Sequence, residues 1–351
     1  MDRPQKNLAI RFALPATILL SMLVIYFPLP TWLMDFLLVA NLAVSVLMLL
    51  AAVFVRTPLE LKVFPSLLLV TTLSRLSLNV ATTRLILGNG ATDRELAAGE
   101  IVNGFSQFVA GDSIVVGSII FLILFLVQFL VITKGATRIG EVAARFALDS
   151  MPGRQMAIDA DLQNGAINFE EAQRRRRELV QYADFQGSMD GASKYVRGDA
   201  IAGLAITGIN IVGGMVQGLA AGMSIQEAAN VFTRLTIGDG LVSQLPALLI
   251  SLAAGLLITR GTEDSDLPSD SITQLISSPV AMFCSAAFLM LLPMANLPAI
   301  PLWTIGGGLI VGGMLVSKSN REQAKTLSRE IKSAAREPKI ERLLETDQIE
   351  L

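Results

Sequence analysis

Long apolar stretches alternate with shorter polar ones along most of the chain. About 17 to 25 apolar residues are needed to cross a bilayer as a helix, and windows of roughly this kind can be marked eight times in the 351 residues. We therefore predict an all-α polytopic membrane protein with about eight transmembrane helices. In chain order the windows are 12–27, 33–55, 63–87, 113–133, 200–222, 240–259, 279–295 and 299–317.

The polar stretches divide this pattern into five parts. Two large polar segments stand out, one between the fourth and fifth apolar windows and one at the C-terminal end. In the first of them, Asn168 followed three residues later by Glu171 predicts the start of a helix. The expected parts are a cytoplasmic N-terminal tail (1–11), transmembrane helices 1–4 (12–133), a small cytoplasmic insert (134–198), transmembrane helices 5–8 (199–317) and a cytoplasmic linker (318–351).

The positions of the cationic residues predict how the chain is oriented. Most of the 28 Lys and Arg residues lie in the N-terminal tail, the insert and the C-terminal tail. Loops rich in Lys and Arg remain on the cytoplasmic side of a membrane. We therefore expect a multi-pass protein of the bacterial inner membrane with both termini in the cytoplasm. The loops on the opposite side, including 88–112 and 223–239, are expected to be short or acidic.

Composition excludes most kinds of enzyme. Hydrophobic residues make up 52% of the chain and charged residues 17%, and there is no histidine at all. This removes Ser-His-Asp catalysis and histidine metal sites, and the single Cys284 excludes a disulfide framework or a CxxC site. No Walker A sequence is present. We expect no catalytic residues, no cofactor and no enzymatic activity.

Two patterns in the insert are also judged to be structural. Asp159, Asp161, Gln163 and Glu170 stand at four of the ligand offsets of an EF-hand loop, but Asn164 occupies the position that needs glycine, so we expect no metal. The run 174–177 is four consecutive arginines. Such a run is typical of a solvated surface or of contact with anionic lipid headgroups, and nucleic acid is not expected as a partner.

The third apolar window contains two charged residues, which membrane interiors disfavour. A charge at the bilayer centre costs about 2.5 to 3.5 kcal/mol on insertion scales. At 100° per residue, Arg75 and Asn79 share one helix face with Thr82, whereas Arg84 projects to the opposite face. These groups either hold neighbouring helices together or line an ion or substrate pathway, and the spacing leaves both interpretations open.

The fifth window begins with a carboxylate between charged and small residues. Lys194 and Arg197 precede Asp199, and Asn210 follows on the same helical face. This stripe favours a wet ion pathway with a titratable acid at its cytoplasmic mouth, its pKa raised by burial and lowered by the two cations. The alternative is that Asp199 only caps the N-terminus of a helix.

Glycines in the same window predict close helix packing. Gly214, Gly218 and Gly222 follow one another at four-residue steps, and small residues at this spacing allow helices to approach closely. The contact could lie within one subunit or between subunits.

Four longer segments carry a resemblance to a known family. RLSLNVATTRLIL, ALDSMPGRQMAIDADLQNGAI, FQGSMDGASKYVRGDAIAG and LTIGDGLVSQLPALLIS resemble signature blocks of the FHIPEP family. These are the export-gate membrane proteins of bacterial type III secretion, in flagella and in virulence injectisomes. The resemblance extends from about Phe12 to Arg260 and is weaker beyond, and the MDGASKYVRGDA block favours the flagellar branch.

This resemblance implies a function and several partners. It implies a homo-oligomeric ring, expected to be a nonamer, that works with other membrane components of the export apparatus. It also implies coupling of proton motive force, with sodium as a further ion, to protein export. Family members continue into a large soluble domain for exported proteins and chaperones, which is absent here, so 318–351 is expected to lead toward it.

The resemblance also points to individual residues. By motif position, Asp199 is the foremost candidate for a proton-responsive acid. Lys194 and Arg84 are the matching basic candidates, and Asp149 and Asp239 are weaker ones. Two other functions stay open from the sequence, namely a stand-alone ion channel or secondary transporter, and an inert ring scaffold in which Asp199 is only a helix cap.

Overall fold

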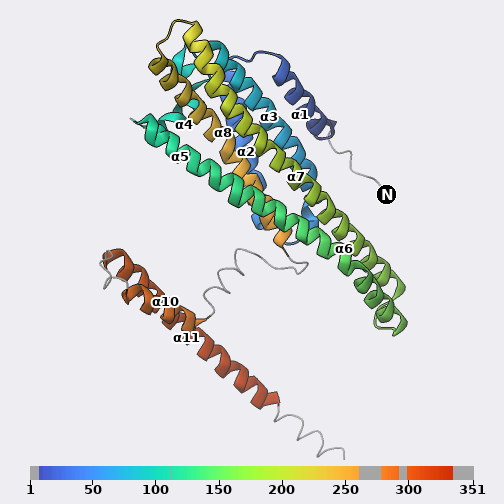
Figure 1. Ribbon diagram of the computed structural model, residues 1–351. Helices are drawn as coiled ribbons and strands as arrows, with labels where there is room; N and C mark the ends of the chain where they lie inside the picture. Colours follow the sequence, from blue (N-terminus) through green and yellow to red (C-terminus); the bar gives the residue numbers. More distant parts are fainter. Residues whose placement is uncertain (1–7, 112, 261–277, 292–298, 335–351) are drawn as a thin grey trace, which may run out of the picture. The chain divides into compact units, whose positions relative to one another are not determined.

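The computed structural model describes residues 8–111, 113–260, 278–291 and 299–334, and every regular element within these ranges is helical (Figure 1). The chain forms two units, Met1–Ser265 and Asp266–Leu351. The first unit contains α1 (Leu8–Tyr26), α2 (Thr31–Phe54), η1 (Pro58–Leu61), α3 (Phe64–Asn89), η2 (Arg94–Leu96), α4 (Glu100–Ala110), α5 (Ile114–Leu126), η3 (Val127–Thr133), α6 (Lys134–Gln163), α7 (Phe169–Ala220) and α8 (Ile225–Thr259). The second contains α10 (Pro279–Leu291), which packs against α11 (Ala299–Ala334).

The described helices confirm an all-helical membrane protein without establishing the count of eight spans. Five are long and apolar enough to cross a membrane: α2, α3, the continuous helix Ile114–Gln163, α7 and α8. Two further apolar helices, Leu14–Tyr26 and Pro279–Leu291, are shorter. The first half of the expected C-terminal linker, 318–334, continues α11 without a break, and the second half, 335–351, lies outside the described residues.

The polar segment 134–198 is a helical hairpin that continues the membrane helices. The first arm follows directly from α5 and η3 and runs to Gln163, and the second arm is the first part of α7, which runs unbroken from Phe169 to Ala220. Figure 1 shows α6 and α7 side by side along this hairpin. The predicted helix start is confirmed, because the Asn168 side chain accepts a hydrogen bond from the Glu171 N–H at 2.8 Å.

Three of the four arginines in the run form ion pairs, two of them with acids of the other arm. Arg174 and Arg175 each donate to Glu171 at 2.9 Å. Arg175 also approaches Asp161 on α6, and Arg176 pairs with Asp159 on the same helix. Of the acids that resembled EF-hand ligands, Asp159 and Asp161 therefore lie on helix α6 and pair with arginines, whereas Glu170 lies in the first turn of α7.

Helix α8 lies at the centre of the first unit. It packs against α2, α4 and α7, while α3 packs against α7 and α1 against α3. The sequence predicted a loop over 223–239, but α8 begins at Ile225, where the Ser224 hydroxyl accepts a hydrogen bond from the Glu227 N–H at 3.2 Å. This cap starts the helix early and carries Asp239 into the core, where it is 5% exposed.

Glycines set the distance between α7 and α8. A Cβ atom added at Gly214 would overlap the ring of Phe232, and one added at Gly218 would lie 2.8 Å from the Cβ of Ala228. Both positions allow the close approach that the sequence predicted. Gly222, expected on the same packing face, instead lies in the turn after α7 with a φ of +89° and no neighbour within 4 Å of an added Cβ.

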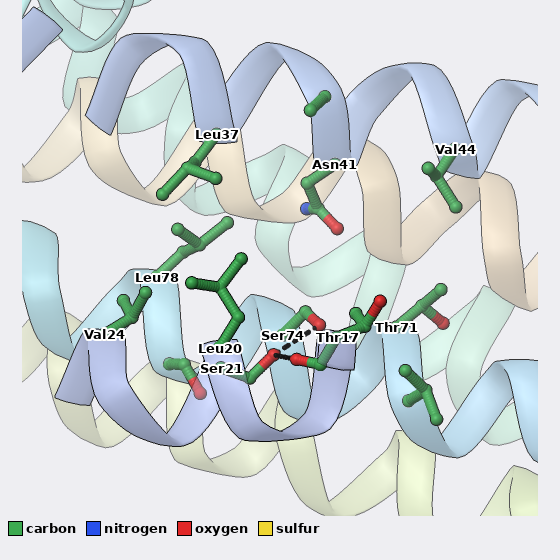
Figure 2. Close-up of a pocket in the computed structure, with 13 residues that line it drawn as sticks. Thr17, Leu20, Ser21, Val24, Leu37, Asn41, Val44, Thr71, Ser74 and Leu78 are labelled. Atoms are coloured by element: carbon green, nitrogen blue, oxygen red, sulfur yellow. Dashed lines mark hydrogen bonds between the residues drawn. The ribbon is translucent and has the colours of Figure 1, made fainter. Parts of the chain in front are cut away.

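A cavity of about 180 Å³ lies between α1, α2 and α3 (Figure 2). Its wall is mainly apolar, with Leu20 and Leu78 among the labelled side chains. Ser21 on α1 and Ser74 on α3 share a hydrogen bond of 2.8 Å at its edge, and Ser21 also donates to the Thr17 carbonyl. This hydroxyl pair joins the N-terminal helix to the bundle.

Candidate functional site

Arg75 of α3, the most deeply buried charged residue in the described part of the chain, forms an ion pair with Asp199 of α7. The guanidinium of Arg75 donates from Nε to Oδ2 of Asp199 at 2.6 Å, and its Nη2 also contacts this oxygen. The two side chains are 2% and 4% exposed. A buried ion pair is stable only when its geometry offsets the loss of water around both charges. The pair therefore fixes α3 and α7 relative to each other.

Each partner reaches this place because its helix buries a polar face. On α3, the hydroxyls of Thr72 and Ser77 donate to carbonyls one turn back in the same helix, at 2.6 and 2.9 Å, which satisfies them without outside partners. Arg75 cannot be satisfied in this way and extends to α7. In line with the predicted two faces of this helix, Arg75 is 1% exposed whereas Arg84 is exposed.

Asp199 is not a helix cap. It lies thirty residues into α7, which begins at Phe169, so its own backbone N–H lies within the helix and not at its free end. The capping interpretation is therefore excluded by the structure. The sequence could not show this, because the change from polar to apolar residues near 199 resembles a helix boundary while the helix itself continues.

The two cations that precede Asp199 in the chain do not contact it. Lys194 donates to Asp190 one turn earlier at 2.7 Å, and both Lys194 and Arg197 are exposed. The expected lowering of the Asp199 pKa by these two residues has no structural basis here, since the cationic partner is Arg75. Residues two and five positions away on a helix point to other faces of it.

A second buried acid lies further along the same helices. Asn210 on α7 donates from Nδ2 to Oδ2 of Asp239 on α8 at 3.0 Å, and the two residues are 0% and 5% exposed. The hydroxyl of Thr82 on α3 also lies beside this carboxyl group. Asn210 follows Asp199 by eleven residues, or about three helical turns and 16 Å along the axis. Asp199 and Asn210 thus lie on one face of α7, and Asn210 contacts the second acid, Asp239, on α8.

A small cavity of about 30 Å³, lined by both polar and apolar residues, adjoins Asp199. Asn79 of α3 lines it together with residues of η3, α7 and α8. The full lining consists of Asn79, Phe125, Gln128, Phe129, Asp199, Ala200, Gly203, Thr207, Gly240, Ser243, Gln244 and Ala247. Gln128 and Gln244 were not among the residues predicted from the sequence, although an amide within an apolar window such as FLVQFLVIT is a signal of the same kind as an intramembrane charge.

The remaining candidates lie elsewhere. Arg84 donates to the carbonyls of Ile25 and Tyr26 at 2.6 and 3.2 Å and so caps the C-terminal end of α1. Asp149 is exposed on α6. The structure therefore brings together Arg75, Asn79 and Asp199 at one level and Asn210 with Asp239 at another.

The chemistry available at this site is proton binding and charge separation. Within the described residues no group of three or more Asp, Glu, Cys or His side chains could hold a metal ion. The Asp199 carboxylate has a single charged partner, and its second oxygen, Oδ1, accepts no hydrogen bond. A carboxylate with one free oxygen can accept a proton there without first losing Arg75.

These features define a class of protein, a helical membrane protein with an ion pair and a second carboxyl group buried between its helices. The chain belongs to the FHIPEP family, whose model matches residues 19–351. No solved structure matches the chain.

Relatives with curated names are similar over most of this chain. The flagellar biosynthesis protein FlhA of Proteus mirabilis is 53% identical over 279 residues, which cover 79% of this chain and 40% of that protein. The protein of the same name from Bacillus subtilis is 48% identical over 311 residues, covering 87% and 44%, and that from Helicobacter pylori is 46% identical over 314 residues, covering 88% and 43%. The chain spans less than half the length of these relatives.

Proposed function

We propose that this chain is the membrane part of a protein-export component of the bacterial flagellum, located in the inner membrane, and that it couples proton motive force to export through Asp199. The names of the relatives, all flagellar in the three comparisons above, support the assignment to flagellar export. The coupling rests on one observation, the Arg75–Asp199 pair buried between α3 and α7.

The proposed coupling step is the protonation of Asp199. A proton that binds Oδ1 removes the negative charge and leaves the guanidinium of Arg75 buried without a counter-charge. Leaving one charge of a buried pair alone costs about 3 to 5 kcal/mol. Helices α3 and α7 would relieve this cost by moving apart or by admitting water, so proton binding changes the arrangement of two membrane helices.

Proton release completes the cycle. When Asp199 loses its proton to the other side of the membrane, the carboxylate and Arg75 attract each other again and the helices return. Asn210 lies on the same face of α7 as Asp199, and the Asp239 carboxyl group that it contacts on α8 is the proposed next group along the path. The path would then run between α3, α7 and α8 within one subunit.

Export by the host cell tests this proposal. Asp199→Asn keeps the size and polarity of the side chain but cannot change its charge, and we expect it to abolish flagellar export while the protein still accumulates in the membrane. Arg197→Gln, on the exposed face of the same helix, is the matched control and should export normally. Normal export by Asp199→Asn would contradict the proposal.

The proposal also includes an assembly and an orientation. We propose a homo-oligomeric ring, nonameric by its family resemblance, with both termini in the cytoplasm. Apolar faces available for lipid or for a neighbouring copy run along α5 and α7, at positions such as Val115, Ile119, Leu204 and Val216. Other membrane components of the apparatus, exported proteins and chaperones are the proposed partners, and no enzymatic step is assigned to the chain.

The other two functions make different predictions. A stand-alone channel or secondary transporter would move a small solute across liposomes without any other component. An inert scaffold would tolerate the loss of the buried charge at Asp199 as long as the ring assembled. The burial of the Arg75–Asp199 pair between two helices favours the coupling role over a scaffold. Apolar side chains of similar volume would hold the two helices together at least as stably, so a purely structural contact would not need an ion pair.

A further inference from the structure

Three amide side chains meet beside Asp199 without protein partners. Asn79 of α3, Gln128 of η3 and Gln244 of α8 all line the 30 Å³ cavity, and none of the three makes a side-chain hydrogen bond within the part of the chain that the structure describes. Buried polar groups are nearly always hydrogen-bonded, to protein or to ordered water. Asn79 and Gln128 are 5% and 6% exposed, and Gln244 is half-buried, so amides from three separate elements that line one cavity indicate a bound molecule with hydrogen-bonding capacity.

The backbone supports this arrangement at Gln128. Residues 127–133 form a π-helix, in which hydrogen bonds join residues five apart. Gln128 and Thr133 are both buried, with 6% and 2% exposure, although in an α-helix five residues would turn the second side chain about 140° away from the first. The π turn keeps both on the inner face. It therefore places Gln128 in the wall of the cavity that Asp199 also lines, while Thr133 and Thr137 are buried as well.

The size and charge of the cavity select water as the occupant. A water molecule needs about 10 to 15 Å³ of accessible space and two to four polar partners, so 30 Å³ holds one or two. A metal cation is disfavoured because the single carboxylate is already neutralised by Arg75, and an added cation would place two positive charges beside one negative charge. Water can donate to Asp199 and accept from the amides at the same time.

We propose that Asn79, Gln128 and Gln244 hold one or two water molecules against Asp199, and that Asp199 exchanges its proton through this water. Gln128 is the central positioning residue. The inference rests on the proposed function of Asp199 and specifies its proton route. In the exchange step the O–H bond of a protonated water breaks as a new O–H bond forms at Oδ1, and the water that remains is neutral.

Two variants remove the water by different means. Gln128→Leu deletes the amide at nearly constant size. Gly203→Val fills the space directly, since Gly203 lines the cavity and an added Cβ meets no atom within 4 Å. Each has a matched control on its own helix, Leu130→Val on the exposed side of the π segment and Gly208→Val, which is also free of neighbours but does not line the cavity.

Proton flux into liposomes containing the purified chain is the first measurement, with incorporation and oligomeric state checked for each variant. We expect Gln128→Leu and Gly203→Val to lower flux at least about tenfold, in line with the loss of a positioned proton-transfer group. Leu130→Val and Gly208→Val should match the unmodified protein, and Gln128→Asn, which keeps an amide and leaves space for water, should restore most of the flux. Inhibition by sodium would indicate a cation in the cavity and would overturn the water assignment.

Infrared difference spectra of the same samples give an answer that does not depend on flux. An internal water should give an O–H band that moves when heavy-oxygen water replaces ordinary water, and this band should be missing in Gln128→Leu and Gly203→Val only. If the band is absent from the unmodified protein, or unchanged in both variants, the water site is refuted. If Asp199→Asn itself retains full flux, the proposed function fails. If Asp199 is required but both cavity variants conduct normally, only the water route fails.

Discussion

Arg75 of α3 and Asp199 of α7, 124 residues apart in the sequence, form the buried ion pair that joins two membrane-spanning helices. Neither of the cations closest to Asp199 in the sequence contacts it. The counter-charge of this acid is therefore a tertiary feature, and both the stability and the proposed function of the bundle depend on it.

The effect of mutations on stability should distinguish the Arg75–Asp199 ion pair from an uncharged packing contact. Arg75→Leu leaves the Asp199 charge buried alone and should lower the free energy of unfolding by about 3 to 5 kcal/mol. The double replacement Arg75→Leu with Asp199→Leu leaves no charge and should cost less than either single change. Detergent-driven unfolding followed by circular dichroism measures this, with the exposed Arg197→Leu as a control.

The double variant also separates stability from function. It should be folded and yet inactive in export, because no group remains that can bind a proton at this place. A double variant that exports normally would show that the pair serves only to hold the helices together.

The Asn210–Asp239 contact predicts a smaller, local effect. Asn210→Leu removes the amide that donates to Asp239 and leaves a buried carboxyl group without this partner, so we expect a loss of about 1 to 3 kcal/mol in unfolding free energy. Asn210→Ser, which keeps a donor, should recover part of it. Equal stability of Asn210→Leu and the unmodified protein would mean that water or Thr82 replaces the amide.

The close contact at Gly214 leaves no space for a methyl group between α7 and α8. Gly214→Ala places a methyl group where the Phe232 ring lies, and overpacking of this kind typically costs about 1 to 3 kcal/mol. The second change Phe232→Leu should relieve the overlap. Gly208→Ala on the same helix has no neighbour within 4 Å and should stabilise the protein slightly, because alanine favours helix over glycine. Thermal unfolding in detergent compares the three proteins.

The N-terminus of α4 depends on a side chain from α2. The Asp35 carboxylate accepts hydrogen bonds from the N–H groups of Glu100 and Ile101, both at 3.0 Å, and Gly99 adopts a φ of +103° beside it. Asp35→Ala should cost about 0.5 to 2 kcal/mol, the usual value of a lost N-cap. In Asp35→Ala, the amide protons of Glu100 and Ile101 should exchange faster than in the unmodified protein, while those in the rest of α4 change less. Unchanged exchange at these two residues would rule out the cap.

The hydroxyl pair at the α1 cavity predicts how firmly α1 is held. Ser74→Ala removes the bond to Ser21, which still donates to Thr17, so the expected cost is only about 0.6 kcal/mol, the average for such bonds between membrane helices. The cavity should be little affected. Crosslinking yield between α1 and α3 provides the measurement.

Some of the site could be predicted from the sequence because it depends on spacing along one helix. The burial of Arg75 with Asn79 and the opposite direction of Arg84 follow from 100° per residue, and the start of α7 at Asn168 follows from a local capping pattern. The membrane class follows from the length of apolar windows, because a bilayer requires helices of a minimum length.

The sequence could not supply the partners of these residues. Hydropathy shows where the apolar surface of a helix begins but not where the helix itself begins. The boundaries between polar segments and apolar windows that we predicted at 198 and 239 therefore fall inside the continuous helices α7 and α8. The pairing of Arg75 with Asp199, of Asn210 with Asp239, and the inward turn of Gln128 depend on which helix faces meet. Which helix faces meet is determined only in the tertiary structure. A charge or an amide buried in a membrane requires a partner, and the partner that is nearest in space is far away in the chain.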